Sequence, residues 1–201
     1  MNITAEMVKE LRVKTGAGVM DCKEALAATG GDFEKAIDYL RKKGMSAATK
    51  RSSKAAKDGV IASYIHMGGK IGVLVEVNCE TDFVAKTDDF QSFAKDLTMH
   101  IAAANPLFVN ANEIPAEVIE REKEIYRSQA LAEKKPEKIW DKIIEGKLKK
   151  YYEDVCLVNQ KFIKDTDVTI ETLVNNMIAK TGENIVIRRF VRYQLGEESK
   201  Q

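Results

Sequence analysis

Two runs rich in valine and isoleucine, separated by a short glycine turn, constrain the fold of this chain most. They cover residues 60–66 and 71–79, and Met67-Gly68-Gly69-Lys70 lies between them. Paired glycines supply the positive φ angles that a tight turn needs, so the runs are predicted to form an antiparallel β-hairpin. Apolar residues alternate through the second run, from Ile71 to Cys79. One face of that strand is therefore predicted to be buried, and the other only partly buried.

The first 44 residues carry three short helical patterns joined by glycines. Thr4 is predicted to cap the first helix, because its hydroxyl can accept from a free N–H of the first turn. Asp32 is predicted to cap the third helix in the same way. The inward residues of the second helix are expected to be Met20, Cys22, Ala25 and Leu26. Together the three patterns predict a small helical bundle.

A basic stretch follows at residues 41–57, with seven lysines and arginines and no acid. One hypothesis is that it contacts phosphates. The other is a solvated linker that repulsion between like charges keeps extended. The linker is favoured because no aromatic side chains are interleaved to stack on bases. It predicts a boundary near residue 55, with domains at 1–55 and 56–201.

The larger part of the chain alternates helical patterns with further strand signals. Asp89 is expected to cap a helix that Asn105-Pro106 ends, and the apolar stripe of that helix is expected to comprise Phe90, Phe93, Ala94, Leu97 and Ile101. Pro115 and Pro136 are expected to open two more helices. Residues 151–167 are expected to be irregular with a short strand. Thr169 is predicted to cap a last helix, followed by a strand over 184–195. The fold class is therefore predicted to be α+β, with a three-helix bundle followed by a small antiparallel sheet packed with helices.

Composition narrows the functional classes. Lys plus Arg is 32 and Asp plus Glu is 31 among 201 residues, which argues against a surface built wholly for nucleic acid. No apolar run approaches the ~18 residues of a membrane span, and residues 1–10 have no signal-peptide pattern. Three scattered cysteines and two histidines make neither a disulfide framework nor a zinc site. A reduced cytoplasmic protein without cofactor or metal is expected.

Motifs for covalent chemistry are missing from the sequence: it has no Walker loop, dinucleotide fingerprint, nucleophile elbow or zinc-protease motif. Cys79 and His66 end neighbouring strands, so a nucleophile–base pair is conceivable. A small buried hydrophobic role is favoured for Cys79, since it continues the apolar alternation. Glu80-Thr81-Asp82 could form a paired-carboxylate or cation site, but it offers fewer oxygens than calcium needs.

Asp82 and Phe83 occupy the junction between a buried strand and the following helix. Phe83 could lie under that helix, or it could project from the rigid junction beside a carboxylate. In the second case the pair would suit insertion into a partner protein.

Two segments resemble the signatures of the translation elongation factor Ts family. They are Thr15-Gly16-Ala17-Gly18-Val19-Met20-Asp21-Cys22-Lys23-Glu24-Ala25-Leu26 and Val75-Glu76-Val77-Asn78-Cys79-Glu80-Thr81-Asp82-Phe83-Val84-Ala85-Lys86, and residues 184–190 are similar to the closing strand. The resemblance implies a ubiquitin-associated-like first domain, and a non-enzymatic guanine-nucleotide exchange factor that promotes GDP release from elongation factor Tu. It implies that Thr81, Asp82, Phe83 and Val84 disturb the magnesium site of that GTPase. It also implies partner contacts at Arg12, Met20 and His66.

The sequence also departs from longer family members, which carry two core repeats, a protruding helical hairpin and a C-terminal module. Only one core is visible here, and it combines features of both repeats. The resemblance therefore implies the short form of the family, in which a homodimer replaces the missing half. Residues 185–195 would offer the pairing edge. Bacterial cytoplasm is the expected location, with no membrane and no direct nucleic-acid contact; the alternative function is a nucleic-acid-binding adaptor that uses residues 41–57.

Overall fold

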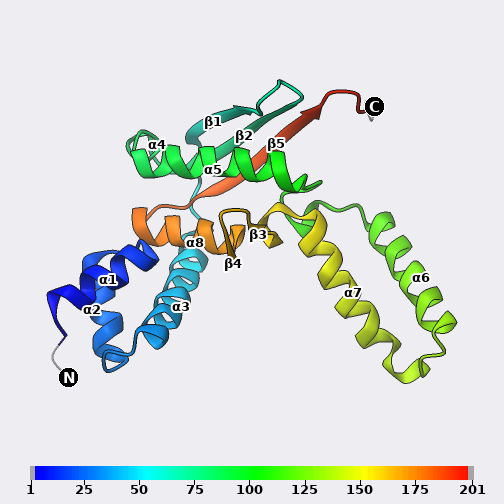
Figure 1. Cartoon of the computed structure of the whole chain (residues 1–201), viewed down its shortest axis with the longest axis horizontal. Coiled ribbons are helices and arrows are strands. Elements are labelled where there is room, and N and C mark those ends of the chain that lie inside the picture. Colours follow the sequence, from blue (N-terminus) through cyan, green and yellow to red (C-terminus); the bar gives the residue numbers. More distant parts are fainter. Residues whose placement is uncertain (1–2, 199–201) are drawn as a thin grey trace. The chain divides into compact units, whose positions relative to one another are not determined.

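The computed structural model describes residues 3–198 and confirms the α+β class. The chain divides into two compact units. The first combines residues 1–63, 75–96 and 171–188, and the second combines 64–74, 97–170 and 189–201. Figure 1 shows the order of the elements along the chain. Within residues 3–198, no helix has both the length and the apolar character that crossing a membrane requires.

The first unit begins with the predicted three helices, α1 (Ala5–Thr15), α2 (Val19–Ala28) and α3 (Phe33–Arg51). The Thr4 hydroxyl accepts the Met7 N–H at 3.3 Å, and the Asp32 carboxylate accepts the Lys35 N–H at 3.1 Å, so both predicted caps are confirmed. The buried core of the bundle consists of Val8, Leu11, Cys22, Ala25, Leu26 and Ala36.

Met20 is not part of this core: its side chain is 73% exposed, so the inward position expected for it is wrong. The buried stripe of α2 is set by Cys22, Ala25 and Leu26, which are three and four residues apart. Met20 precedes Cys22 by two residues, which rotates it by about 200° around the helix and away from that stripe.

The basic stretch is not an extended linker up to residue 51, because α3 continues to Arg51. Lysine, arginine and alanine all favour helix, and Gly44 is the one strong helix breaker within 41–51. The repulsion that was expected to extend this stretch is reduced by ion pairs. The Lys43 ammonium lies 2.8 Å from Asp21 and 2.6 Å from Glu24.

The predicted hairpin is formed by β1 (Asp58–Ile65) and β2 (Ile71–Cys79), and β5 (Val186–Gln194) adds a third strand in the order β1-β2-β5. The alternation predicted for β2 is confirmed, since Val73, Val75, Val77 and Cys79 are buried while Leu74 is exposed. Gly59 has a φ of +140°, and a Cβ there would lie 2.1 Å from the Val77 carbonyl oxygen. Only glycine therefore fits where β1 approaches β2.

Two helices follow β2 directly: the single turn α4 (Asp82–Ala85) and then α5 (Asp88–Ala104). The predicted apolar stripe of α5 is buried and comprises Phe90, Phe93, Ala94, Leu97 and Ile101. The predicted cap was wrong by two residues. The Thr87 hydroxyl accepts the Phe90 N–H at 3.3 Å, so the helix begins before Asp89.

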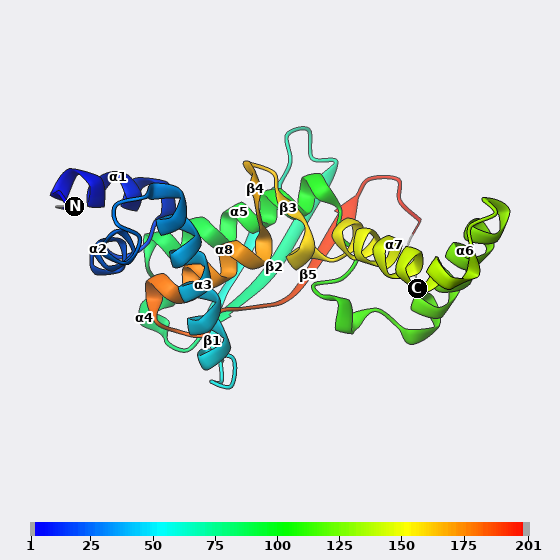
Figure 2. The same ribbon diagram turned by 90° about the horizontal axis from the view of Figure 1, so that it is seen from below.

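The second unit contains a helical hairpin of α6 (Ala116–Ala132) and α7 (Trp140–Val155), which lie side by side in Figures 1 and 2. The resemblance assigned such a hairpin to longer members, but this chain has one. Pro115 and Pro136 each lie just before a helical turn rather than at its first position, and α7 continues into the stretch expected to be irregular. The remaining short elements of residues 105–169 are 3₁₀ turns at Ala111–Glu113, Glu137–Ile139 and Leu157–Asn159, with β3 (Lys161–Phe162) paired to β4 (Asp165–Thr169).

The last helix, α8 (Ile170–Thr181), begins directly after Thr169 and ends directly before Gly182. Gly182 has a φ of +71°, and its N–H donates to the Ile178 carbonyl at 2.8 Å. Glu183 and Asn184 then form the short connection from α8 to β5. That connection belongs to the first unit, as do the end of β2 and α4.

Candidate functional site at the start of α4

The segment Thr81–Val84 lies on the single helical turn that follows the buried end of β2. Thr81 is the N-cap of α4, and its hydroxyl accepts the Val84 N–H at 3.5 Å. Phe83 lies in this turn with its side chain 80% exposed, which excludes the position under the following helix. Burying a phenylalanine side chain is worth about 1.5–3 kcal/mol, so burial of Phe83 against a partner would contribute about that much to the free energy of binding.

Asp82 is paired with a cation of its own helix. Its Oδ2 lies 2.5 Å from the Lys86 ammonium, four residues further along the chain. The hydrogen bond and the positive charge of Lys86 hold the pKa of the Asp82 carboxyl below its ordinary value. Asp82 is therefore an anion at neutral pH, next to an exposed aromatic ring.

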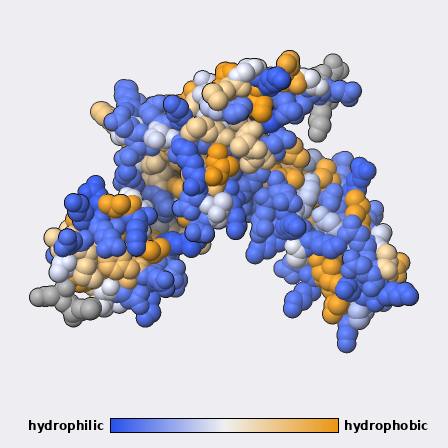
Figure 3. Space-filling view, in the orientation of Figure 1, coloured by the Kyte–Doolittle hydropathy of each residue, from blue (hydrophilic) through white to orange (hydrophobic). Residues whose placement is uncertain are grey.

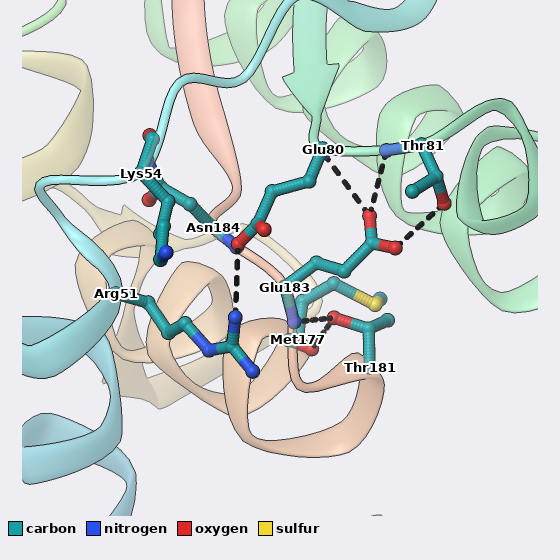
Figure 4. Close-up of polar contacts among 8 residues, drawn as sticks. All are labelled: Arg51, Lys54, Glu80, Thr81, Met177, Thr181, Glu183 and Asn184. Carbon is teal, nitrogen blue, oxygen red and sulfur yellow. Dashed lines mark hydrogen bonds and ion pairs between the residues drawn. The ribbon is translucent and has the colours of Figure 1, made fainter.

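The backbone before α4 is held by a carboxylate from a distant part of the sequence. Glu183 Oε2 accepts the N–H groups of Glu80 and Thr81, both at 3.0 Å, and Glu183 Oε1 accepts the Thr81 hydroxyl at 2.6 Å (Figure 4). In return, Glu80 Oε1 accepts the Asn184 N–H at 2.7 Å and lies 3.5 Å from the Arg51 guanidinium. The start of the segment is thus fixed to the connection between α8 and β5.

The two chemical alternatives for this region find no support. The His66 N–H donates to the carbonyl of Ile71, which is the first residue of β2, whereas Cys79 is the last residue of β2. Cys79 and His66 are therefore separated by the length of this strand. Burial, with the charges of Glu183 and Asp58 adding, raises the pKa of the Cys79 thiol to about 11. Glu80 and Asp82 face different cations, and residues 3–198 contain no group of three His, Cys, Asp or Glu side chains placed to hold a metal ion.

The other predicted partner residues are exposed. Arg12 lies on α1 and Met20 on α2, on either side of the Gly16–Gly18 turn, and Val13 and Val19 beside them are 79% and 49% exposed. Figure 3 shows hydrophobic patches among hydrophilic surface on the visible face of this bundle, at lower left. His66 belongs to the second unit, where it is exposed at the β1–β2 turn and its Nδ1 lies 2.9 Å from the Tyr64 hydroxyl.

Sequence reasoning missed Glu183, Asn184 and Lys86 at this site. The available signal for the first two was their place in the turn between an expected helix and an expected strand, where polar side chains often have specific partners. That signal does not identify the partners, which lie about a hundred residues earlier in the chain.

Comparisons with known proteins agree over nearly the whole chain. The family model "Elongation factor TS" matches residues 2–197. Elongation factor Ts of Syntrophus aciditrophicus (strain SB) is 79% identical over 201 residues, which is 100% of both chains. Elongation factor Ts of Geobacter metallireducens is 61% identical over 197 residues, covering 98% of this chain and 91% of the relative. That of Heliobacterium modesticaldum is 60% identical over 195 residues, covering 97% and 91%. The chain therefore belongs to the elongation factor Ts family.

Proposed function

We propose that this chain promotes GDP release from elongation factor Tu, and that Thr81, Asp82, Phe83 and Val84 are the residues that drive release. Family membership supports the exchange activity. The observation that carries the assignment to this segment is the 80% exposure of Phe83, on a turn anchored to the end of a buried strand. An exposed aromatic ring beside an anion, on a rigid support, suits insertion into a partner.

The proposed mechanism needs no covalent step. In GTPases a magnesium ion bridges the nucleotide phosphates and the protein, so displacing its ligands weakens nucleotide binding. Phe83 would insert beside a helix of the GTPase, and the Asp82 carboxylate would disturb the magnesium site. Each tenfold increase in the GDP release rate requires about 1.4 kcal/mol. Burial of Phe83 can supply roughly a ten- to hundredfold increase. The chain thus acts as a binding partner, without a cofactor and without enzymatic chemistry of its own.

Exchange then follows from reciprocal coupling. If binding of this chain weakens the affinity of the GTPase for GDP, GDP weakens the affinity for this chain by the same factor. The chain would dock through the N-terminal bundle, with Arg12 and Met20 contacting the GTPase domain, and His66 would press on the GTPase near its phosphate loop. Exposure of all three side chains supports these contacts.

We further propose a cytoplasmic homodimer. β5 is an edge strand of the order β1-β2-β5, and Tyr193 and Leu195 near its end are 71% and 76% exposed. An exposed apolar edge favours pairing with a second copy. The boundary near residue 55, between a ubiquitin-associated-like domain and the core, is also a proposal. Light scattering of the purified chain should give the mass of two copies, and a monomeric mass would contradict the homodimer.

The test of the function is release of a fluorescent GDP analogue from purified elongation factor Tu, with and without the chain. We expect faster release with the chain, and loss of most of the acceleration in the variant Asp82→Ala, Phe83→Ala. No acceleration by the unmodified chain with a cognate partner would contradict the proposed function.

The nucleic-acid adaptor hypothesis has no support from the family match, and α3 uses part of its basic charge internally, through Lys43 and Arg51. The double variant Lys50→Ala, Lys54→Ala separates the two hypotheses, because it removes basic charge and leaves the contact of Arg51 with Glu80 in place. Exchange should continue in this variant if the segment 81–84 acts. Loss of function together with salt-sensitive RNA binding would favour the adaptor.

A further inference from the structure

We propose that Glu183 is a positioning residue for nucleotide exchange: its carboxylate fixes the backbone of residues 80–81 and so sets the direction in which Asp82 and Phe83 project. The proposal rests on the proposed function and adds to it a residue outside both signature segments. It also assigns a role to the turn between α8 and β5, which the exchange mechanism above does not use.

The Glu183 carboxylate receives several hydrogen-bond donors at once. Glu183 accepts three hydrogen bonds, from the N–H groups of Glu80 and Thr81 and from the Thr81 hydroxyl, at 3.0, 3.0 and 2.6 Å. Hydrogen bonds to an ionised acceptor are roughly twice as strong as those between neutral groups. Three of them on two consecutive residues fix both the place and the orientation of that backbone.

The backbone of Glu183 is itself held in place by a hydrogen bond to α8. Its own N–H donates to the Thr181 hydroxyl oxygen at 3.3 Å, and that hydroxyl donates to the Met177 carbonyl at 2.9 Å (Figure 4). The next residue, Asn184, is buried; its backbone N–H donates to Glu80 Oε1 and its side-chain amide donates to the Lys54 carbonyl, both at 2.7 Å. The hydrogen bonds from Glu80 and Thr81 to the Glu183 carboxylate, called the brace below, are therefore tied to α8 on one side and to the chain after α3 on the other.

The Thr81 hydroxyl takes part in both the brace and the cap of α4. It has a single proton, which it donates to Glu183, and its oxygen accepts the Val84 N–H at 3.5 Å. The carboxylate thus orients the hydroxyl so that its lone pairs remain for the cap. A helix of one turn has little stability of its own, so the direction of Phe83 depends on this end of α4.

The same brace could serve only to stabilise the fold, and steady-state parameters distinguish the two roles. The chain would dock through its N-terminal bundle, which Glu183 does not touch among the interactions described above. Mispositioning of Phe83 should lower the maximal GDP release rate at saturating chain and leave the half-saturating concentration almost unchanged. Loss of folded protein would instead raise the half-saturating concentration and preserve the maximal rate.

The experiment measures GDP release from elongation factor Tu over a range of chain concentrations for Glu183→Ala, Glu183→Asp and Glu183→Gln. We expect the alanine and aspartate variants to lower the maximal rate roughly ten- to a hundredfold, since displacing a reacting group by 1 Å can cost that much. Aspartate keeps the charge but is too short to reach both N–H groups. Glutamine keeps the length and one acceptor oxygen for both N–H groups, so it should recover most of the rate.

Glu171→Ala is the matched control, because Glu171 is an exposed carboxylate on α8, the helix that precedes Glu183, and its replacement should leave both parameters unchanged. If the alanine variant does not fold, the maximal release rate of the aspartate variant tests the proposal instead. An unchanged maximal rate in the folded variants, or a change confined to the half-saturating concentration, would overturn the proposal.

Amide hydrogen exchange of the free chain tests the brace without the GTPase. We expect Glu183→Ala to speed exchange at the amides of residues 80–84 while the amides of β2 stay protected. Unaltered exchange at 80–84 would overturn the brace even if release slowed. If the unmodified chain does not accelerate GDP release, the proposed function fails, and this measurement still reports on the brace separately.

Discussion

The Lys86 ammonium lies 2.5 Å from Asp82 Oδ2, so the carboxylate that is proposed to disturb the magnesium site of the GTPase is already paired within its own helical turn. Both side chains are solvent-accessible. The pairing therefore orients Asp82 and keeps it ionised rather than holding the fold together.

Replacing Lys86 with methionine should raise the pKa of the Asp82 carboxyl toward its ordinary value, because the hydrogen bond and charge that lower it are removed. The fold should be unaffected. An NMR titration of the Asp82 side chain in both chains measures the change. Equal pKa values in the two chains would show that Lys86 does not control Asp82 in solution.

Protonation of His100 should destabilise the chain. Its ring is buried in the second unit, where Nε2 contacts Gln160 at 3.0 Å and, among the described residues, Nδ1 has no hydrogen-bond partner. Burial lowers the pKa of His100 below the ordinary 6.5. The unfolded chain therefore binds the proton more readily, and stability should be full above about pH 6.5 and decline as the pH falls from there toward the pKa of the folded state.

Urea unfolding of the unmodified chain at pH 8 and pH 5.5 measures this decline. Since the chain has only two histidines, His66→Gln is a direct control, and it should show the same decline. His100→Gln should show a smaller one. An equal decline in all three chains would assign the effect to other groups.

Gly59→Ala should destabilise the sheet by more than about 2 kcal/mol, since it combines an unfavourable φ of +140° with a Cβ 2.1 Å from a carbonyl oxygen. Gly146→Ala is the matched opposite. Gly146 lies inside α7 with no heavy atom within 4 Å of a Cβ, so alanine should stabilise by about 0.5–1 kcal/mol. Denaturant unfolding midpoints measure the stability change of each variant. If Gly59→Ala leaves the midpoint unchanged, the approach of β1 to β2 is looser than described.

The thiols should be unreactive in the folded chain. Cys22, Cys79 and Cys156 are buried, and burial raises the pKa of each. At pH 8 we expect slow alkylation of all three in native buffer and rapid alkylation in denaturant. Cys79→Ser should retain GDP exchange, whereas loss of exchange in a folded variant would revive a chemical role for this thiol.

The sequence predicted what depends on neighbouring residues. The caps at Thr4 and Asp32, the alternation in β2 and the stripe of α5 follow from local periodicity, and all were confirmed. Wrong predictions arose where two local signals competed. Charge favoured an extended chain after residue 41, but helix propensity and the ion pairs of Lys43 extended α3 to Arg51.

The brace of the candidate site was not predictable from local patterns. Glu183 and Thr81 are 102 residues apart, and their contact exists because the turn after α8 lies beside the end of β2. Periodicity identifies β2 and β5 as strands, but it does not determine which strands are neighbours. The exposure of Phe83 was open for the same reason, since it depends on where the short helix after β2 points.

Residues 82 and 83 are proposed to drive GDP release. The most direct measurement is the maximal release rate of a fluorescent GDP analogue from elongation factor Tu, for the unmodified chain and for Asp82→Ala, Phe83→Ala. Leu131→Ala, which truncates another exposed apolar side chain, is the control. We expect a fall of roughly tenfold or more in the double variant, with unchanged circular dichroism and an unchanged rate in the control. A double variant that releases GDP as fast as the unmodified chain would contradict the proposed role of residues 82 and 83.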